Sequence, residues 1–236
     1  MRILGPLRLT GLHLAKLQQS RAYDLVMRMP LLAWSMFCAM VQMAGLSQHI
    51  RSTNMVLPLT AYVIKLAMLL STIGFLLLLS AAVIVRARPM GKAHGLEPRI
   101  SAFFGTFLIY TIPLFPRREL SETVEMVSTV LILVGSLAAV VALFRLGRSF
   151  SMMAEARRLV TSGPYRYVRH PLYLAEEVAI FGIFIQFFSI WTIIIFALQI
   201  VFQLRRMRNE EAVLTEILPE YASYQSKTPR LIPGIY

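Results

Sequence analysis

The sequence predicts an all-α fold, a polytopic bundle of membrane helices. Hydrophobic residues make up 57% of the 236 residues, and charged residues only 15%. A soluble domain has about 45–50% apolar and roughly 25% charged residues, so both values indicate a membrane protein. The apolar residues form long unbroken runs, which excludes disorder, collagen and coiled coil. The net charge of +12 comes from basic residues that flank these runs, as beside anionic lipid, so we expect membrane lipids and no nucleic acid as partners.

The apolar runs divide the chain into three regions. Residues 1–29 are basic and broken by glycine and proline, which predicts an arm lying at the membrane interface. Residues 30–144 form a transmembrane region, and residues 145–236 hold one further apolar run together with the chemistry-bearing motifs. A spanning helix needs about 20 mostly apolar residues. The predicted spans of the second region are Pro30–His49, Leu59–Val85, Ile100–Pro116 and Thr123–Phe144.

The fifth apolar run, Leu174–Gln203, is predicted to fold as a helical hairpin. A single helix of about 30 residues would extend ~45 Å at about 1.5 Å per residue, whereas the hydrocarbon core is only ~30 Å thick. A turn near Phe188–Trp191 avoids this mismatch and returns the basic tail to its starting face. The Lys and Arg counts of successive connectors alternate between high and low, which predicts cytoplasmic N- and C-termini.

Two polar segments flank this hairpin. The first reads GPYRYVRHPLY over residues 163–173. Proline is favoured at the first position of a helix, so Pro171 is expected to begin one. Arg169 and His170 would then lie at a helix N-terminus, which favours an anion, with Tyr173 in the first turn.

The second segment begins with RRMRNEE over residues 205–211 and continues to two tyrosines, Tyr221 and Tyr224. Residues three or four apart share one face of a helix. The series Glu211, Leu214, Leu218 and Tyr221 has this spacing, so Glu211 and Tyr221 are predicted to lie on one face. Each residue alone is more often a membrane anchor or a surface ion pair. Two such segments, in this order at the two ends of one hairpin, instead indicate a binding or catalytic site.

These motifs resemble the isoprenylcysteine carboxyl methyltransferase family, part of a wider group of integral membrane methyltransferases that includes phospholipid N-methyltransferases. The resemblance covers roughly residues 145–236, including the late RLIP motif at residues 230–233. It departs from the family pattern at Ala175, where glycine is frequent, and at Leu218-Pro219, which is expected to bend the tail.

The resemblance implies a site for S-adenosylmethionine, formed by the connector and the tail and open to the membrane. In this interpretation His170 and the adjoining helix end suit the cofactor carboxylate. Glu210 or Glu211 suits the ribose hydroxyls or the ammonium. The aromatic candidates for the adenine or the sulfonium are Tyr165, Tyr173, Tyr221 and Tyr224.

The favoured function is methylation of a lipophilic acceptor, namely the carboxylate of a prenylated cysteine or a similar amphiphile. Arg169 and Arg206 are then the predicted catalytic residues, because arginine holds a carboxylate bidentately. The alternatives are amine or phospholipid N-methylation, which would need a base such as a glutamate, and a non-enzymatic transporter or scaffold. Glu176 and Glu177 either line the acceptor entrance or bond nearby arginines. No metal is expected, because no His/Cys ligand cluster is present.

Overall fold

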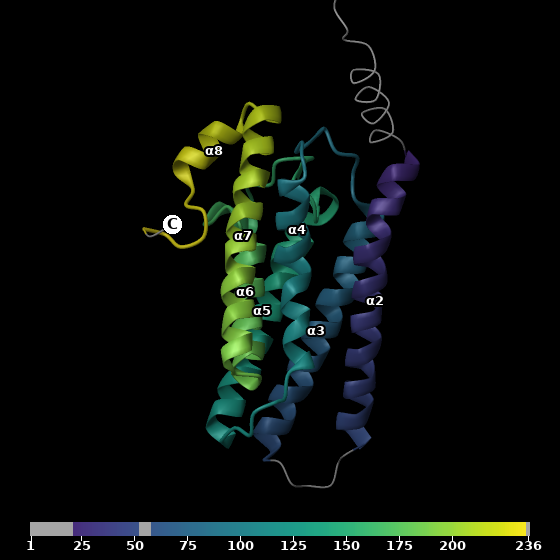
Figure 1. Cartoon of the computed structure of the whole chain (residues 1–236), viewed down its shortest axis with the longest axis vertical. Coiled ribbons are helices and arrows are strands. Elements are labelled where there is room, and N and C mark those ends of the chain that lie inside the picture. The colour runs from purple at the N-terminus through teal and green to yellow at the C-terminus, as the bar shows by residue number, and fades with distance from the viewer. Residues whose placement is uncertain (1–20, 52–57, 235–236) are drawn as a thin grey trace, which may run out of the picture.

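The chain forms a bundle of helices that run along the longest axis of the molecule (Figure 1). The computed structural model describes residues 21–51 and 58–234. Four helical segments in the described residues are long and apolar enough to cross a membrane: Arg28–Arg51, Leu59–Val85, Glu122–Ser149 and Ile190–Ile217. The predicted all-α membrane fold is confirmed, and the protein is an integral membrane protein.

The first two spans form the helices α2 (Arg21–Arg51) and α3 (Leu59–Val85). α3 has the predicted limits. α2 starts within the predicted N-terminal arm and continues through Pro30, so the described part of that arm is helical. Residues 1–20 of the arm lie outside the described residues.

The third predicted span is not one long helix. α4 (Glu97–Phe107) is followed by a 3-10 segment, η1 (Leu108–Leu114). An α-helix of this length extends only ~17 Å, about half the hydrocarbon thickness. Pro113 lies inside η1 and lacks the N–H that an α-helix would need there. The fourth helix of spanning length is therefore α7, in the hairpin, rather than Ile100–Pro116.

The predicted hairpin is present. α5 (Glu122–Leu146) precedes it, and its two arms are α6 (Pro171–Gln186) and α7 (Ile190–Ile217). Residues 187–189 form the turn, close to the predicted position. Ser189 caps α7, because its hydroxyl accepts from the Thr192 N–H and the Thr192 hydroxyl accepts in return from the Ser189 N–H.

The hairpin brings both motif segments to one end of the bundle, the end that carries α8 in Figure 1. The short elements at this end are β1 (Gly91–Lys92), η2 (Gly147–Ser149), β2 (Glu155–Ala156), η3 (Gly163–Arg166) and α8 (Tyr221–Lys227). β1 and β2 pair antiparallel. The expected bend at Leu218-Pro219 is present, since α7 stops at Ile217 and α8 begins at Tyr221.

α6 is fixed against α5 by small residues that let the two backbones touch. A Cβ atom added to Gly135 would lie 2.4 Å from the Ala179 nitrogen, and one added to Gly182 would lie 2.8 Å from the Ser128 carbonyl oxygen. The Ser128 hydroxyl donates to the Gly182 carbonyl at 2.8 Å. Close contact between small residues is the usual way in which membrane helices associate.

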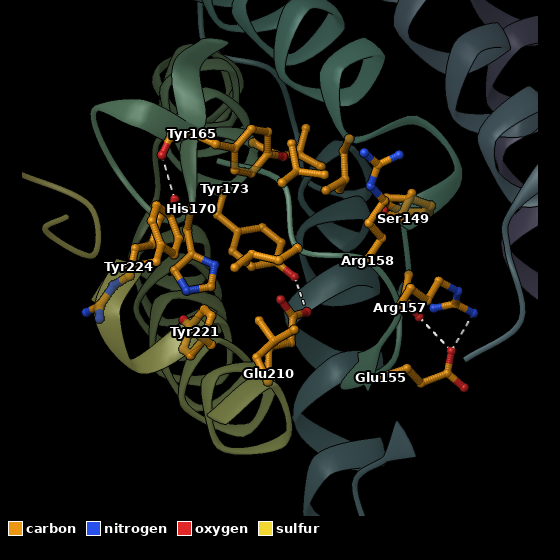
Figure 2. A pocket seen from close by; sticks show the side chains of 18 of the residues that line it. Ser149, Glu155, Arg157, Arg158, Tyr165, His170, Tyr173, Glu210, Tyr221 and Tyr224 are labelled. Atoms are coloured by element: carbon orange, nitrogen blue, oxygen red, sulfur yellow. Dashed lines mark hydrogen bonds and ion pairs between the residues drawn. The ribbon is translucent and has the colours of Figure 1, made fainter. Parts of the chain in front are cut away.

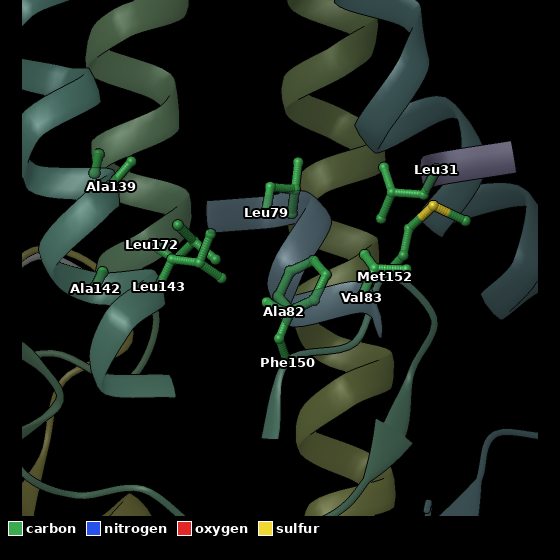
Figure 3. Close-up of a cluster of buried hydrophobic side chains, with 11 residues drawn as sticks. Leu31, Leu79, Ala82, Val83, Ala139, Ala142, Leu143, Phe150, Met152 and Leu172 are labelled. Carbon is green, nitrogen blue, oxygen red and sulfur yellow. The ribbon is translucent and has the colours of Figure 1, made fainter. Parts of the chain in front are cut away.

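The apolar core joins the bundle to the connector that follows α5 (Figure 3). Val83 of α3, Leu143 of α5 and Leu172 of α6 are almost completely buried there. Phe150 and Met152 of the connector pack into the same cluster. The connector is therefore held against the helix ends, which fixes the start of α6 and the motif before it.

Candidate functional site

The first motif and the tail are joined through their backbones. The N–H groups of Arg169 and His170 donate to the carbonyls of Pro229 and Arg230, at 2.9 and 3.1 Å. The Tyr224 hydroxyl donates to the Tyr165 carbonyl at 2.5 Å. Segments about 60 residues apart in sequence therefore form one unit, as the hairpin prediction requires.

Glu211 is the ionic centre of this unit. Its carboxylate lies 3.0 Å from His170 Nε2, 3.2 Å from Arg169 Nε and 2.5 Å from Arg230 Nη2. Only 3% of Glu211 is exposed. A buried carboxylate is tolerated when several charge-assisted hydrogen bonds satisfy it. Glu211 thus ties α7 to the start of α6 and to the tail.

A polar cavity opens beside this unit (Figure 2). Seven of the nine predicted site residues line it: Tyr165, Arg169, His170, Tyr173, Glu210, Tyr221 and Tyr224. The other two do not. Glu211 is not part of the lining, and its carboxylate is engaged by three basic side chains; the predicted contact of Glu211 with a cofactor stays a prediction. Arg206 lies on the opposite side of Tyr173.

Tyr173 and Glu210 form the inner wall of the polar cavity. The Tyr173 hydroxyl donates to Glu210, and the Tyr173 ring stacks on His170 with 5.4 Å between centroids. The Tyr221 hydroxyl is buried and has no hydrogen-bond partner among the described residues. A buried polar atom without a partner is costly, so this hydroxyl is available to a ligand.

The phenols of the cavity are neutral at physiological pH. Burial raises the pKa of Tyr165 and Tyr221 above the usual value and that of Tyr224 to about 12. The rings therefore present uncharged faces and hydroxyls, while Glu210 supplies the negative charge of this wall. Such a set can bind a ligand that combines an aromatic ring, hydroxyls and a cationic group.

Arg206 is buried on α7, and its guanidinium contacts groups from several elements. Its guanidinium carbon lies 4.7 Å from the centroid of the Tyr173 ring, and Nε lies 3.4 Å from Glu210 Oε1. Nη1 donates to the Thr106 hydroxyl at 3.0 Å, and Nη2 to the Ser151 carbonyl at 3.4 Å. Arg169 is also engaged, by Glu211 and by the Gln225 carbonyl. Both guanidinium groups already have partners within the protein. The role of holding an acceptor carboxylate, predicted for both arginines, stays a prediction.

A second, larger cavity lies inside the bundle on the Arg206 side of Tyr173. It encloses about 350 Å³, against about 100 Å³ for the polar cavity, and its wall is mainly apolar. Drug-sized ligands occupy cavities of about 300–1,000 Å³. Helices α2 to α7 contribute to the wall, with Trp34, Phe75 and Ile183 among the apolar side chains. Tyr173 and Phe150 line both cavities and so separate them.

Of the residues that line this second cavity, the sequence pointed to Tyr173, Glu176 and Arg206 but not to the rest of the wall. Gln203 lies within an apolar run and lines the cavity wall. Trp34 of α2 contacts the rings of Phe107 and Tyr110, with centroids 6.1 and 5.0 Å away. The available signal was the presence of Gln199 and Gln203, four residues apart, inside a membrane helix, where polar side chains need buried partners.

The chain was compared with known proteins. Residues 127–216, from within α5 to near the end of α7, match the model of the isoprenylcysteine carboxyl methyltransferase (ICMT) family. The resemblance is confirmed over this segment. The matched segment contains the motif at residues 163–173 and the pair Glu210–Glu211, but it ends before Tyr221 and Tyr224. Over this segment the chain is therefore similar to a family of membrane methyltransferases.

Two curated relatives are metal resistance proteins by name. The cobalt-zinc-cadmium resistance protein CzcN of Cupriavidus metallidurans is 33% identical over 114 residues, which cover 46% of this chain and 52% of CzcN. The nickel-cobalt-cadmium resistance protein NccN of Alcaligenes xylosoxydans xylosoxydans is 34% identical over 82 residues, covering 34% of this chain and 38% of NccN. The chain thus spans about half or less of either relative. That no metal is bound stays a prediction.

Proposed function

We propose that this protein is an S-adenosylmethionine-dependent methyltransferase that acts on a lipophilic acceptor drawn from the bilayer. One observation carries the proposal. The polar cavity under the family motif and the apolar cavity inside the bundle share a wall, formed by Tyr173 and Phe150. A water-soluble ligand and a lipid-soluble ligand would meet at this wall.

The polar cavity has groups suited to each part of S-adenosylmethionine. His170 and Arg169 lie at the N-terminus of α6, whose first-turn N–H groups favour a carboxylate. Glu210 suits an ammonium or the ribose hydroxyls, and the Tyr221 hydroxyl has no competing partner in the described part of the chain. A ligand of this size would have to widen the cavity. Bound there, the cofactor would supply a methyl group activated by its sulfonium.

The chain itself would supply position and a dry environment. Methyl transfer needs the two reacting groups about 3–3.5 Å apart and aligned, so the rigidity of the shared wall matters most. The Tyr173 ring is held from three sides, by Glu210, by the His170 ring and by the Arg206 guanidinium. The apolar wall of the inner cavity excludes water. The carboxylate of a prenylated cysteine stays a prediction from the family resemblance.

Calorimetric titration of the detergent-solubilised protein with S-adenosylmethionine tests this function. Saturable binding is expected for the wild type and for His94→Ala, which alters an exposed histidine outside the polar cavity. His170→Ala should abolish binding, because it removes a lining residue and one partner of Glu211. If the wild type shows no saturable binding, the proposal fails and a non-enzymatic transporter or scaffold is favoured.

A further inference from the structure

Glu176 is a half-buried acid that the proposed methyl transfer leaves without a role. It lies on α6, three residues after Tyr173, and both residues line the apolar cavity. Glu176 and Arg206 are the charged side chains in the described wall of that cavity. Charged groups at membrane depth are costly and usually functional.

The charges around Glu176 do not balance. Arg206 is the positive charge that acts on it, whereas Glu177 and Glu210 are two further negative charges that act on it. Arg206 is itself paired with Glu210. Around Glu176, beside the apolar cavity, the carboxylates therefore outnumber the cations, which disfavours an acceptor that brings another carboxylate. Within residues 21–51 and 58–234, the titratable groups that act on Glu176 lie on four elements: Tyr173 and Glu177 on α6, Arg206 and Glu210 on α7, Tyr110 on η1 and Tyr165 on η3.

Gln203 adds a second acceptor beside Glu176. Its side chain is 2% exposed, lines the same cavity, and interacts with Glu176. Its Oε1 atom is buried and has no hydrogen-bond partner among the described residues. A carboxylate and an unpaired amide oxygen together suit a head group that is positively charged and carries several N–H donors. An ammonium has both properties, and a carboxylate has neither.

We propose that Glu176, with Gln203, binds the amine head group of a lipophilic acceptor and takes a proton from its nitrogen. The inference rests on the proposed methyltransferase function. In this step one N–H bond breaks, a bond forms between the proton and a Glu176 carboxylate oxygen, and the electron pair stays on nitrogen. The step is necessary because a protonated amine has no free electron pair with which to accept a methyl group.

The position of Glu176 suits this step. Residues three apart lie on the same face of a helix, so Glu176 follows Tyr173 along the cavity side of α6. The amine would thus lose its proton close to the wall that separates the two cavities, while its hydrocarbon chain fills the apolar part. The cavity volume of about 350 Å³ suits a chain of this kind.

Glu177 provides a matched control. It is the next residue on α6, and its Oε1 accepts from Gln199 at 2.7 Å, but it does not line the cavity. Glu176→Gln and Glu177→Gln each remove one half-buried carboxylate and keep the side-chain volume. A purely structural need for carboxylates in the hairpin would affect both variants alike.

Binding can be followed without a methyl donor. The chain has two tryptophans, of which Trp34 lines the cavity and Trp191 is 62% exposed on α7. In a Trp191→Phe background, Trp34 fluorescence would report titration with dodecylamine or with dodecanoate in detergent. The amine should bind at least tenfold more tightly than the acid. Glu176→Gln should weaken amine binding about tenfold, and Glu177→Gln less than twofold.

Methyl transfer provides the second measurement. With labelled S-adenosylmethionine, the wild type should methylate dodecylamine, and Glu176→Gln should lose this activity while its affinity for S-adenosylmethionine is unchanged. Preference for dodecanoate, binding of neither probe, or unchanged amine binding by Glu176→Gln would overturn the inference. The absence of S-adenosylmethionine binding in the wild type would instead overturn the proposed function, since amine binding is measured without it.

Discussion

The two cavities on either side of Tyr173 are built in opposite ways. The polar cavity is lined mainly by the connector after α5, the start of α6, the end of α7 and α8, and beside it Glu211 contacts three basic side chains. The apolar cavity is walled by six helices, and its acid, Glu176, has unbalanced charges around it. Balanced charge fixes the position of chain segments, whereas unbalanced charge leaves a requirement that a ligand can meet. We therefore expect the first region to be the more rigid, and the second to discriminate between ligands by their charge.

The largest loss of affinity for S-adenosylmethionine is expected from a change at Glu211, whose charge is fully balanced by its partners. Glu211→Ala would leave Arg169, Arg230 and His170 close together without their carboxylate. Breaking a buried ion pair costs about 3–5 kcal/mol, so the tail should detach and affinity for S-adenosylmethionine should fall more than a hundredfold. Calorimetry measures the affinity, and circular dichroism should show that the bundle remains helical. Near-normal affinity would show that the tail does not depend on Glu211.

The next largest effect concerns the helix pair that carries the shared wall. Gly135→Ala places a methyl group against the α6 backbone, whereas Gly74→Ala meets no atom within 4 Å. Overpacking costs about 1–3 kcal/mol, so Gly135→Ala should lower the thermal unfolding temperature in detergent, and Gly74→Ala should not. Equal unfolding temperatures for both variants would contradict the close α5–α6 contact.

Tyr173→Phe tests whether the hydroxyl of the shared wall affects ligand affinity in the polar cavity but not in the apolar cavity. It removes the hydroxyl that bonds Glu210 but keeps the ring against Arg206 and His170. A hydrogen bond to a charged group contributes about 1.5–3 kcal/mol, so affinity for S-adenosylmethionine should fall at least tenfold. Affinity for dodecylamine should change less than twofold. A similar loss for both ligands would show that the cavities are not independent.

The smallest effect is expected from Tyr224→Phe. This change removes one neutral hydrogen bond, from the Tyr224 hydroxyl to the Tyr165 carbonyl, which is worth about 0.5–1.5 kcal/mol. Affinity for S-adenosylmethionine should fall between twofold and about tenfold. Tyr167→Phe is the control, because Tyr167 is 70% exposed in the same connector. A loss as large as that of Glu211→Ala would mean that Tyr224 contacts the ligand directly.

Much of the architecture could be predicted from hydropathy and charge. The limits of α3 and the hairpin turn follow from the length of the apolar runs, because the membrane thickness sets the length of a helix. The span predicted at Ile100–Pro116 was wrong in its form, since hydropathy does not report that α4 ends at Phe107 and gives way to a 3-10 segment. A short helix such as α4, which packs among longer helices, does not need to cross the whole membrane.

The candidate site was predictable only in part, for a similar reason. The predicted hairpin correctly brought His170 and Tyr173, at the start of α6, close to Glu210 on α7. It did not distinguish Glu210, which faces the cavity, from Glu211, which faces the basic side chains. Adjacent residues on a helix point about 100° apart, so which of the two faces the ligand depends on how α7 is rotated against its neighbours.

The sequence by itself determined that this protein is a membrane bundle, that its last apolar run turns back, and that two polar segments meet at one end. These follow from local properties: run length, charge alternation and residue order. Only the tertiary structure decided that Arg206 lies on the apolar-cavity side of Tyr173, that Glu211 is paired with three basic side chains, and that Glu176 lines an apolar cavity. The physical reason is that each of these depends on atoms from helices distant in sequence, whose packing no local pattern encodes.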